Sequence, residues 1–156
     1  MVLRGEAIIT YSDFERINDS IEDVDAKYKN PRNLCSGSVR QLNSQITAER
    51  NVNFEAFALV TAEGVDFKNS RKEQFEWLKR QGFDVVEYKT VTAETLPEAV
   101  EEFAEAVSGY DIPSDGLVLL LDDIAYGESL GRTAKFPRNA IAFKWADEIK
   151  ETKLEY

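Results

Sequence analysis

Histidine is absent from this chain, and Cys35 is its single cysteine. Histidine is the usual catalytic base, so serine–histidine and cysteine–histidine catalysis are excluded within these residues. One thiol can form neither a disulfide inside the chain nor a thiolate zinc site. Any chemistry carried by these residues must therefore depend on carboxylates, lysines and arginines.

Long apolar runs and an excess of basic residues are missing as well. No stretch approaches the roughly 20 apolar residues of a membrane helix, and the opening MVLRGEAIIT lacks the basic and apolar regions of a signal peptide. The 29 acidic and 19 basic residues give a net charge of −10. Non-specific binding to a polyanion is disfavoured by that average, although a local basic pocket is compatible with it.

The hydrophobic pattern predicts an α+β fold with largely antiparallel sheets and flanking helices. Strands and helices mix without a regular βαβ alternation, which favours this class. Gly116–Leu121 is apolar on both faces and is expected to be a central strand. The other expected strands cover residues 2–10, 52–61, 84–92 and 139–146. Helices are expected to begin at the caps Ser12, Asn30, Ser70 and Thr95, and the last two are expected to end at Gly82 and Gly109.

The last expected strand has two unlike faces. Lys144 shares its face with Ala140 and Ala142, while large apolar side chains point the other way. The ammonium group of Lys144, beside the space left by two small alanine side chains, could bind an anion or a nucleotide that lies on the sheet. The alternative is a lysine that extends into solvent from an ordinary exposed face.

Residues 31–42 are expected to form a helix that carries two arginines. Arg32, Ser36 and Arg40 are spaced four residues apart and form one stripe, beside the small residues Gly37 and Ser38. Glycine inside a helix costs about 1 kcal/mol relative to alanine, so something must approach closely at this point. Phosphates held by the two guanidinium groups, or a neighbouring backbone, would explain it.

Three further positions have both a functional and a structural interpretation. Glu6 can accept hydrogen bonds from ligand hydroxyls, or form a surface ion pair with Arg4. Asp115, before the apolar strand, can bind Mg²⁺ together with phosphate oxygens or simply make a turn, whereas the following Asp122 and Asp123 are expected to be caps. Phe57 can stack on a base or belong to the core.

Four stretches together resemble the bacterial NAD-dependent DNA ligases. They are RGE at 4–6, NPRN and GSVRQL within 30–42, DG at 115–116 and FPRNAIAFKW at 136–145. The resemblance is to the C-terminal portion of the nucleotidyltransferase (adenylation) domain, and implies a partial, ATP-grasp-like core over residues 1–150. Residues 151–156 resemble the start of the connection to an OB-fold.

The resemblance implies a role for each matching residue. Glu6 would contact the adenosine ribose, Phe57 would lie over the adenine, and Asp115 and Lys144 would be catalytic, with Lys144 on the adenylate phosphate. Two arginines complete the set, Arg32 at the nucleotide and nicked-DNA phosphates and Arg40 at the DNA phosphate. No metal ligand is assigned within the chain.

The resemblance also implies the activity of a parent protein. Such ligases use NAD as the AMP donor, with Mg²⁺, and seal nicks in duplex DNA through enzyme-adenylate and DNA-adenylate intermediates. A cytoplasmic, monomeric protein of DNA replication and repair is expected. This chain alone is expected to be inactive, because it contains no K-x-D-G motif with the lysine nucleophile.

Two departures from the family pattern support a second hypothesis. Leu120 stands where the family usually has a lysine, and no lysine or arginine occurs between Lys89 and Arg132, where an arginine is usual. The alternative is thus a degenerate, non-catalytic nucleotide-binding or scaffold remnant of the same domain.

Overall fold

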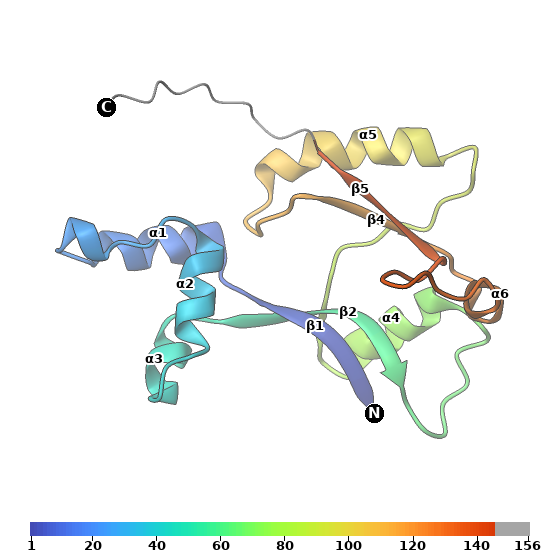
Figure 1. The fold of residues 1–156 in the computed structure, drawn as a ribbon, viewed down its shortest axis with the longest axis horizontal. Helices are drawn as coiled ribbons and strands as arrows, with labels where there is room; N and C mark the ends of the chain where they lie inside the picture. Colours follow the sequence, from blue (N-terminus) through green and yellow to red (C-terminus); the bar gives the residue numbers. More distant parts are fainter. Residues whose placement is uncertain (146–156) are drawn as a thin grey trace.

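The computed structural model describes residues 1–145, which form an α+β fold (Figure 1). The strands are β1 (Val2–Ile8), β2 (Asn53–Thr61), β3 (Asp84–Val85), β4 (Gly116–Leu120) and β5 (Ala140–Lys144). The α-helices are α1 (Tyr11–Asp19), α2 (Pro31–Ser38), α3 (Ser44–Glu49), α4 (Arg71–Arg80), α5 (Leu96–Ala106) and α6 (Ile124–Ser129), and two 3₁₀ helices are η1 (Val24–Ala26) and η2 (Val107–Gly109). The expected connection at 151–156 lies outside the described residues.

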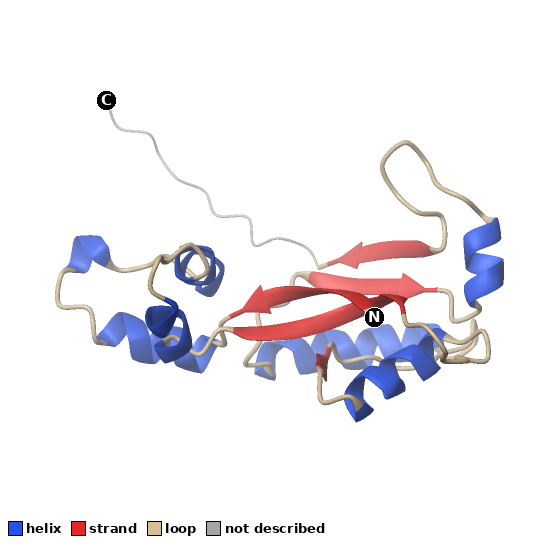
Figure 2. Ribbon diagram, turned by 90° about the horizontal axis from the view of Figure 1, so that it is seen from below, coloured by secondary structure: helices blue, strands red, loops and turns tan. Residues whose placement is uncertain are grey.

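The described strands form two separate sheets. The first has the order β1-β2-β3, with β1 and β2 antiparallel and β3 parallel to β2; the second is the antiparallel pair β4-β5. Helices line one side of the strands, and the opposite side is largely uncovered (Figure 2). The expectation of largely antiparallel sheets with flanking helices is confirmed.

Two small apolar clusters form the core. Ile9, Ile17, Leu34 and Cys35 join the end of β1 to α1 and α2. Ala56, Leu59 and Leu78 join β2 to α4, with several aromatic residues packed around them. The first cluster fixes α2 against β1, and it thereby fixes the direction from which Arg32 approaches the end of the first strand.

Most of the predicted caps are present. Asn30 accepts a hydrogen bond from the backbone N–H of Asn33, and Ser70 accepts one from Glu73. Gly82, with a φ of 87°, follows the end of α4. Ser12 was expected to cap α1, but the cap is Thr10, which accepts from the N–H of Asp13. Thr95 occupies the N-cap position of α5 without a side-chain bond to that helix, because its hydroxyl accepts from Thr92 instead.

Several predicted extents are wrong. The helix expected over 31–42 ends at Ser38, the strand expected over 84–92 is reduced to Asp84–Val85, and α3 was not anticipated. Asp123, one of the two caps expected after β4, does cap α6 by accepting from the N–H of Tyr126. β4 is also not a central strand: it pairs with β5 alone among the described residues, and Val118 is 68% exposed. An apolar run indicates a strand, but its place in a sheet depends on partners that the run itself does not specify.

Candidate functional site

Three of the predicted residues line one cavity of about 290 Å³ at the end of β1. Glu6 comes from β1, Arg32 from the first turn of α2, and Asp115 from the loop that precedes β4. The buried Cys35 thiol donates to the carbonyl of Ala7 at 3.1 Å and so ties α2 to β1. The structure therefore brings together residues that are up to 109 positions apart in the chain.

Glu6 faces Arg32 rather than Arg4. The Arg32 Nη2 and Glu6 Oε1 atoms are 3.8 Å apart, with the side chains 83% and 61% exposed, whereas no ion pair joins Glu6 to Arg4 among the described residues. The β-bulge at Arg4 and Gly5 places its extra residue, Phe57, on β2, and Arg4 and Glu6 remain two residues apart along β1. An exposed pair at this distance is worth roughly 0–1 kcal/mol, so an incoming anion can displace the carboxylate from Arg32.

Lys144 is held beside the same cavity by Asp115. Its Nζ donates to Asp115 Oδ2 at 3.0 Å, and Lys144 pairs across the sheet with Gly116. The hydrogen bond from Lys144, its charge and the more distant charge of Arg32 lower the pKa of Asp115. Asp115 is accordingly ionised near neutral pH, and both side chains remain largely exposed.

A hollow lies on the β4-β5 pair, but Lys144 is not among the residues that line it. Val118, Ala140 and Ala142 help to line a second cavity of about 420 Å³, and Phe136 and Pro137 close it from the preceding loop. The register pairs Gly116 with Lys144 and Val118 with Ala142, so these side chains share one face of the sheet. An apolar hollow on the strand that also carries an exposed ammonium group suits a ligand with a flat apolar part and an anionic part.

Arg40 lies outside this arrangement. α2 ends two residues earlier, and Arg40 lines neither cavity. The small residues of α2 also have a simpler explanation than phosphate: a Cβ on Gly37 would lie 3.3 Å from the Tyr28 ring, and Ser38 is fully buried and bonded to Leu34 and Arg50. The low surface of this helix is therefore covered by the protein itself.

Phe57 is exposed rather than part of the core. It is 44% exposed, while its neighbour Ala56 is fully buried against α4. Phe57 falls at the β-bulge, since Ala56 and Ala58 pair with the adjacent residues Gly5 and Arg4. It does not line the cavity at Glu6, so its proximity to a ligand there is not established by the cavity.

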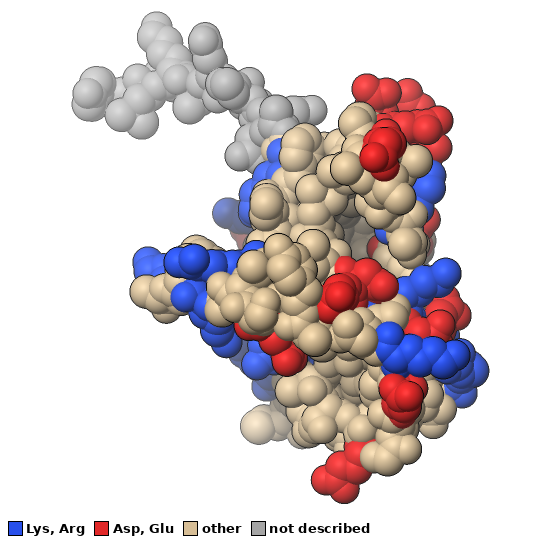
Figure 3. All heavy atoms as spheres, turned by 90° about the vertical axis from the view of Figure 1, so that its right-hand side faces the viewer, with Lys and Arg blue, Asp and Glu red and all other residues tan. Residues whose placement is uncertain are grey.

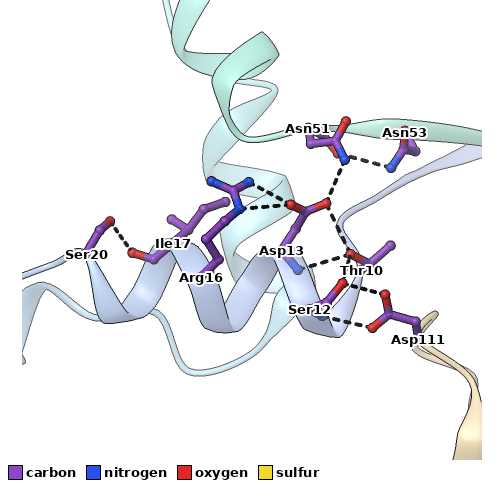
Figure 4. A network of polar contacts seen from close by, with 9 residues as sticks. All are labelled: Thr10, Ser12, Asp13, Arg16, Ile17, Ser20, Asn51, Asn53 and Asp111. Atoms are coloured by element: carbon purple, nitrogen blue, oxygen red, sulfur yellow. Dashed lines mark hydrogen bonds and ion pairs between the residues drawn. The ribbon is translucent and has the colours of Figure 1, made fainter.

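A polar network at the start of α1 was not found from the sequence (Figure 4). Asp111 accepts from the Ser12 N–H at 2.9 Å and from the Ser12 hydroxyl at 2.5 Å, and its carbonyl accepts from the N–H of Tyr11 at 2.8 Å. Asp13 accepts from Arg16 at 2.6 Å and from Asn51 at 2.7 Å. Ser12 and Asp111 are 99 positions apart, and no local pattern marks such a contact.

One face of the molecule carries charges of both signs. On the face shown in Figure 3, basic side chains gather toward the left edge, and basic and acidic side chains are mixed toward the right. Within residues 1–145, no three acidic or cysteine side chains gather closely enough to hold a metal ion. None of the helices in that part of the chain is long and apolar enough to cross a membrane.

Comparison with known proteins shows the family of the chain. The sequence model of the "NAD-dependent DNA ligase adenylation domain" family matches residues 1–148. Proteins named DNA ligase from Lachnoclostridium phytofermentans and Ruminiclostridium cellulolyticum are 65% and 63% identical over 99% of this chain, and one from Mycoplasmopsis agalactiae is 36% identical over 97% of it. The chain spans 22–24% of the length of these relatives. It belongs to the NAD-dependent DNA ligase adenylation domain family.

Proposed function

We propose that this chain supplies part of the pocket in which an NAD-dependent DNA ligase binds the AMP half of NAD. The observation that carries the proposal is the meeting of Glu6, Arg32 and Asp115 around one cavity, with Lys144 bonded to Asp115 at its edge. The cavity, about 290 Å³, is at the lower end of the range for small-molecule sites, roughly 300–1,000 Å³. Its size suits one nucleotide half rather than a complete dinucleotide.

The donor set suits a nucleotide. Glu6 offers carboxylate oxygens to ribose hydroxyls, and Arg32 and Lys144 offer charged donors to a phosphate. Each cation is already paired with an exposed carboxylate of the same site, and such a weak pair allows a phosphate to replace the carboxylate as its partner. Bound NAD supplies an activated AMP group, and the residues of this chain bind and orient it.

Phe57 and Arg40 have supporting roles in the proposal. Phe57 presents an exposed ring on β2, beside the strand that carries Glu6, and we assign it to adenine stacking. Arg40 lies just beyond the end of α2, whose first turn carries Arg32. We assign Arg40, together with Arg32, to phosphates of nicked DNA, which are reached in a later step than the nucleotide.

The proposal extends to a longer protein. We infer that the chain acts within a bacterial, cytoplasmic and monomeric ligase that uses Mg²⁺ and seals nicks in duplex DNA during replication and repair. The lysine that becomes adenylated belongs to a K-x-D-G motif, and this sequence contains none. The chain alone therefore does not form the enzyme-adenylate intermediate.

The test is the mass of the protein after incubation with NAD. The full-length protein should gain the mass of one AMP, and the 156-residue chain should not. Lys144→Ala should slow the gain about 100-fold, the scale found when one preorganised charged donor is removed. Lys135→Ala, which removes an equal charge from an exposed loop residue, should leave the rate unchanged. AMP on the isolated chain, or equal rates in the two variants, would refute the proposal.

One observation favours a second candidate function. Leu120 pairs with Ala140 on the face that carries Lys144, so the side chain there is apolar and the site has one cation fewer than the family pattern implies. A non-catalytic nucleotide-binding or scaffold remnant would have this property. A folded full-length protein that binds NAD but never gains AMP would establish this alternative.

A further inference from the structure

The candidate site is assembled from two halves that have few direct connections. Glu6 and Arg32 belong to β1 and α2, and Asp115 and Lys144 belong to the loop before β4 and to β5. Within the described residues, the sheet that contains β1 shares no strand pairing with the sheet that contains β4. The distance between the halves must therefore be set by contacts outside the strands.

Links of this kind occur beyond both ends of β4. Beyond its carboxyl end, the Ser70 hydroxyl bonds to the Asp122 carboxylate at 3.0 Å, and Asn69 donates to Asp123 at 2.8 Å. Before its amino end, Asp111 bonds to Tyr11 and Ser12 at the start of α1 (Figure 4). The second link is the one near the site, because Asp111 lies four residues before Asp115, and Tyr11 itself lines the cavity.

The Asp111 link is more than a helix cap. Thr10 already caps α1 through the N–H of Asp13, so the helix has its own local cap. Asp111 adds a carboxylate from a distant segment that binds both the N–H and the hydroxyl of Ser12. The two bonds fix the carboxylate in position and direction, and these Ser12 bonds lower the pKa of Asp111, so it is charged at neutral pH.

We propose that Asp111 is a positioning residue for adenylate transfer, which holds Asp115 and Lys144 opposite Glu6 and Arg32 by fastening the loop before β4 to Ser12. The inference rests on the proposed function, since it concerns the alignment of that same site. Asp111 lines neither cavity and need not touch the nucleotide. Asp111 would act by setting the position of Lys144 relative to Arg32, the two side chains proposed to bind the phosphate.

The test compares single-turnover AMP transfer in the full-length protein at saturating NAD. Asp111→Ala removes both side-chain bonds to Ser12, and we expect the rate to fall about 10- to 100-fold, the cost of a misplacement near 1 Å. Asp111→Asn keeps an oxygen that accepts from the Ser12 N–H, and its rate should stay within about threefold of the parent, because the loop remains fastened. Asp66→Ala is the matched control: Asp66 is also an exposed carboxylate with a backbone bond, to Lys68, but it joins no distant segment.

The outcomes separate three explanations. If the parent protein gains no AMP, the proposed function fails and the inference falls with it. If the parent is active and Asp111→Ala transfers AMP at the parent rate, the positioning role is wrong even if the variant unfolds at lower urea. If Asp111→Ala does not fold, Ser12→Pro takes its place: proline is tolerated in the first turn of a helix and removes both the N–H and the hydroxyl that Asp111 accepts from, and an unchanged rate in that variant also overturns the inference.

Discussion

At the scale of single residues, the site depends on two exposed ion pairs that contribute little to stability. The Lys144 and Asp115 side chains are 70% and 82% exposed, and pairs of this kind are worth roughly 0–1 kcal/mol. Their value is in position: each keeps a cation at the edge of a cavity in a direction that a phosphate can use. These cations are therefore suited to exchange a carboxylate partner for a phosphate.

Gly116 is the residue on which the Lys144 strand most directly depends. A Cβ at this position would lie 2.3 Å from the carbonyl oxygen of Phe143 and 2.9 Å from the Cα of Lys144. We expect Gly116→Ala to lower the free energy of unfolding by about 1–3 kcal/mol, because the backbone of β5 must shift to make room. Urea unfolding followed by circular dichroism measures this.

Gly109→Ala provides the comparison for that prediction. A Cβ at Gly109 meets nothing within 4 Å, so this change should alter the free energy of unfolding by less than about 0.5 kcal/mol. Equal losses in the two variants would mean that the close approach of β4 and β5 is not what requires glycine at position 116.

Single residues also show where sequence reasoning succeeds. The alternation around Lys144 has a period of two, which the strand preserves, so the face that Lys144 shares with Ala140 and Ala142 was predictable. Arg40 was misplaced because its predicted stripe assumed one more turn of helix than the chain forms. The Glu6–Arg32 pair and the Asp111–Ser12 bonds join distant segments, and no period within one element encodes them.

At the scale of elements, local signals predicted the starts of α2 and α4, and tertiary contacts decided much of the rest. Asn30 followed by Pro31, and Ser70 followed by Glu73, mark α2 and α4 correctly, because capping involves atoms a few residues apart. The central position expected for β4 was wrong, because a strand's neighbours and its cover come from elsewhere in the chain. α3, with six residues, has too few turns to show a periodic pattern.

The Ser70 hydroxyl both caps α4 and connects that helix to the segment that follows β4. Its hydroxyl accepts from the Glu73 N–H at 3.3 Å and donates to Asp122 at 3.0 Å, so Ser70→Ala removes a cap and a link between α4 and the segment after β4. We expect a loss of about 1–2 kcal/mol in the free energy of unfolding, measured by thermal or urea unfolding. Ser70→Thr keeps the hydroxyl and should recover most of the loss. If Thr and Ala variants were equally unstable, steric fit rather than the two hydrogen bonds would explain the effect.

At the scale of the whole molecule, two effects of lowering the pH change the free energy of unfolding in opposite directions. Protonation of carboxylates that are bonded in the folded state lowers it, and weaker repulsion among carboxylates raises it. Four aspartates of the described residues have a lowered pKa, mainly through a bond from a neighbouring group: Asp13 with Arg16, Asp111 with Ser12, Asp115 with Lys144 and Asp123 with the backbone of Tyr126. Below the ordinary aspartate value of 3.8, the unfolded chain binds more protons than the folded chain. The stability from these groups is thus complete above about pH 5 and is lost as the pH falls further.

The net charge of −10 has its largest effect at neutral pH. Repulsion among the carboxylates weakens as the pH falls toward the isoelectric point near 4.6, and the pKa of Glu55, raised by burial and by Asp84, changes stability in the same direction. We therefore expect the urea midpoint at low salt to rise from pH 7 to about pH 5 and to fall below about pH 4. High salt should raise the urea midpoint at pH 7 and make its rise between pH 7 and about pH 5 smaller, because salt screens the repulsion between exposed charges. Glu55→Gln should reduce the rise, whereas a midpoint that is independent of salt at pH 7, or that keeps increasing below pH 3, would contradict this balance.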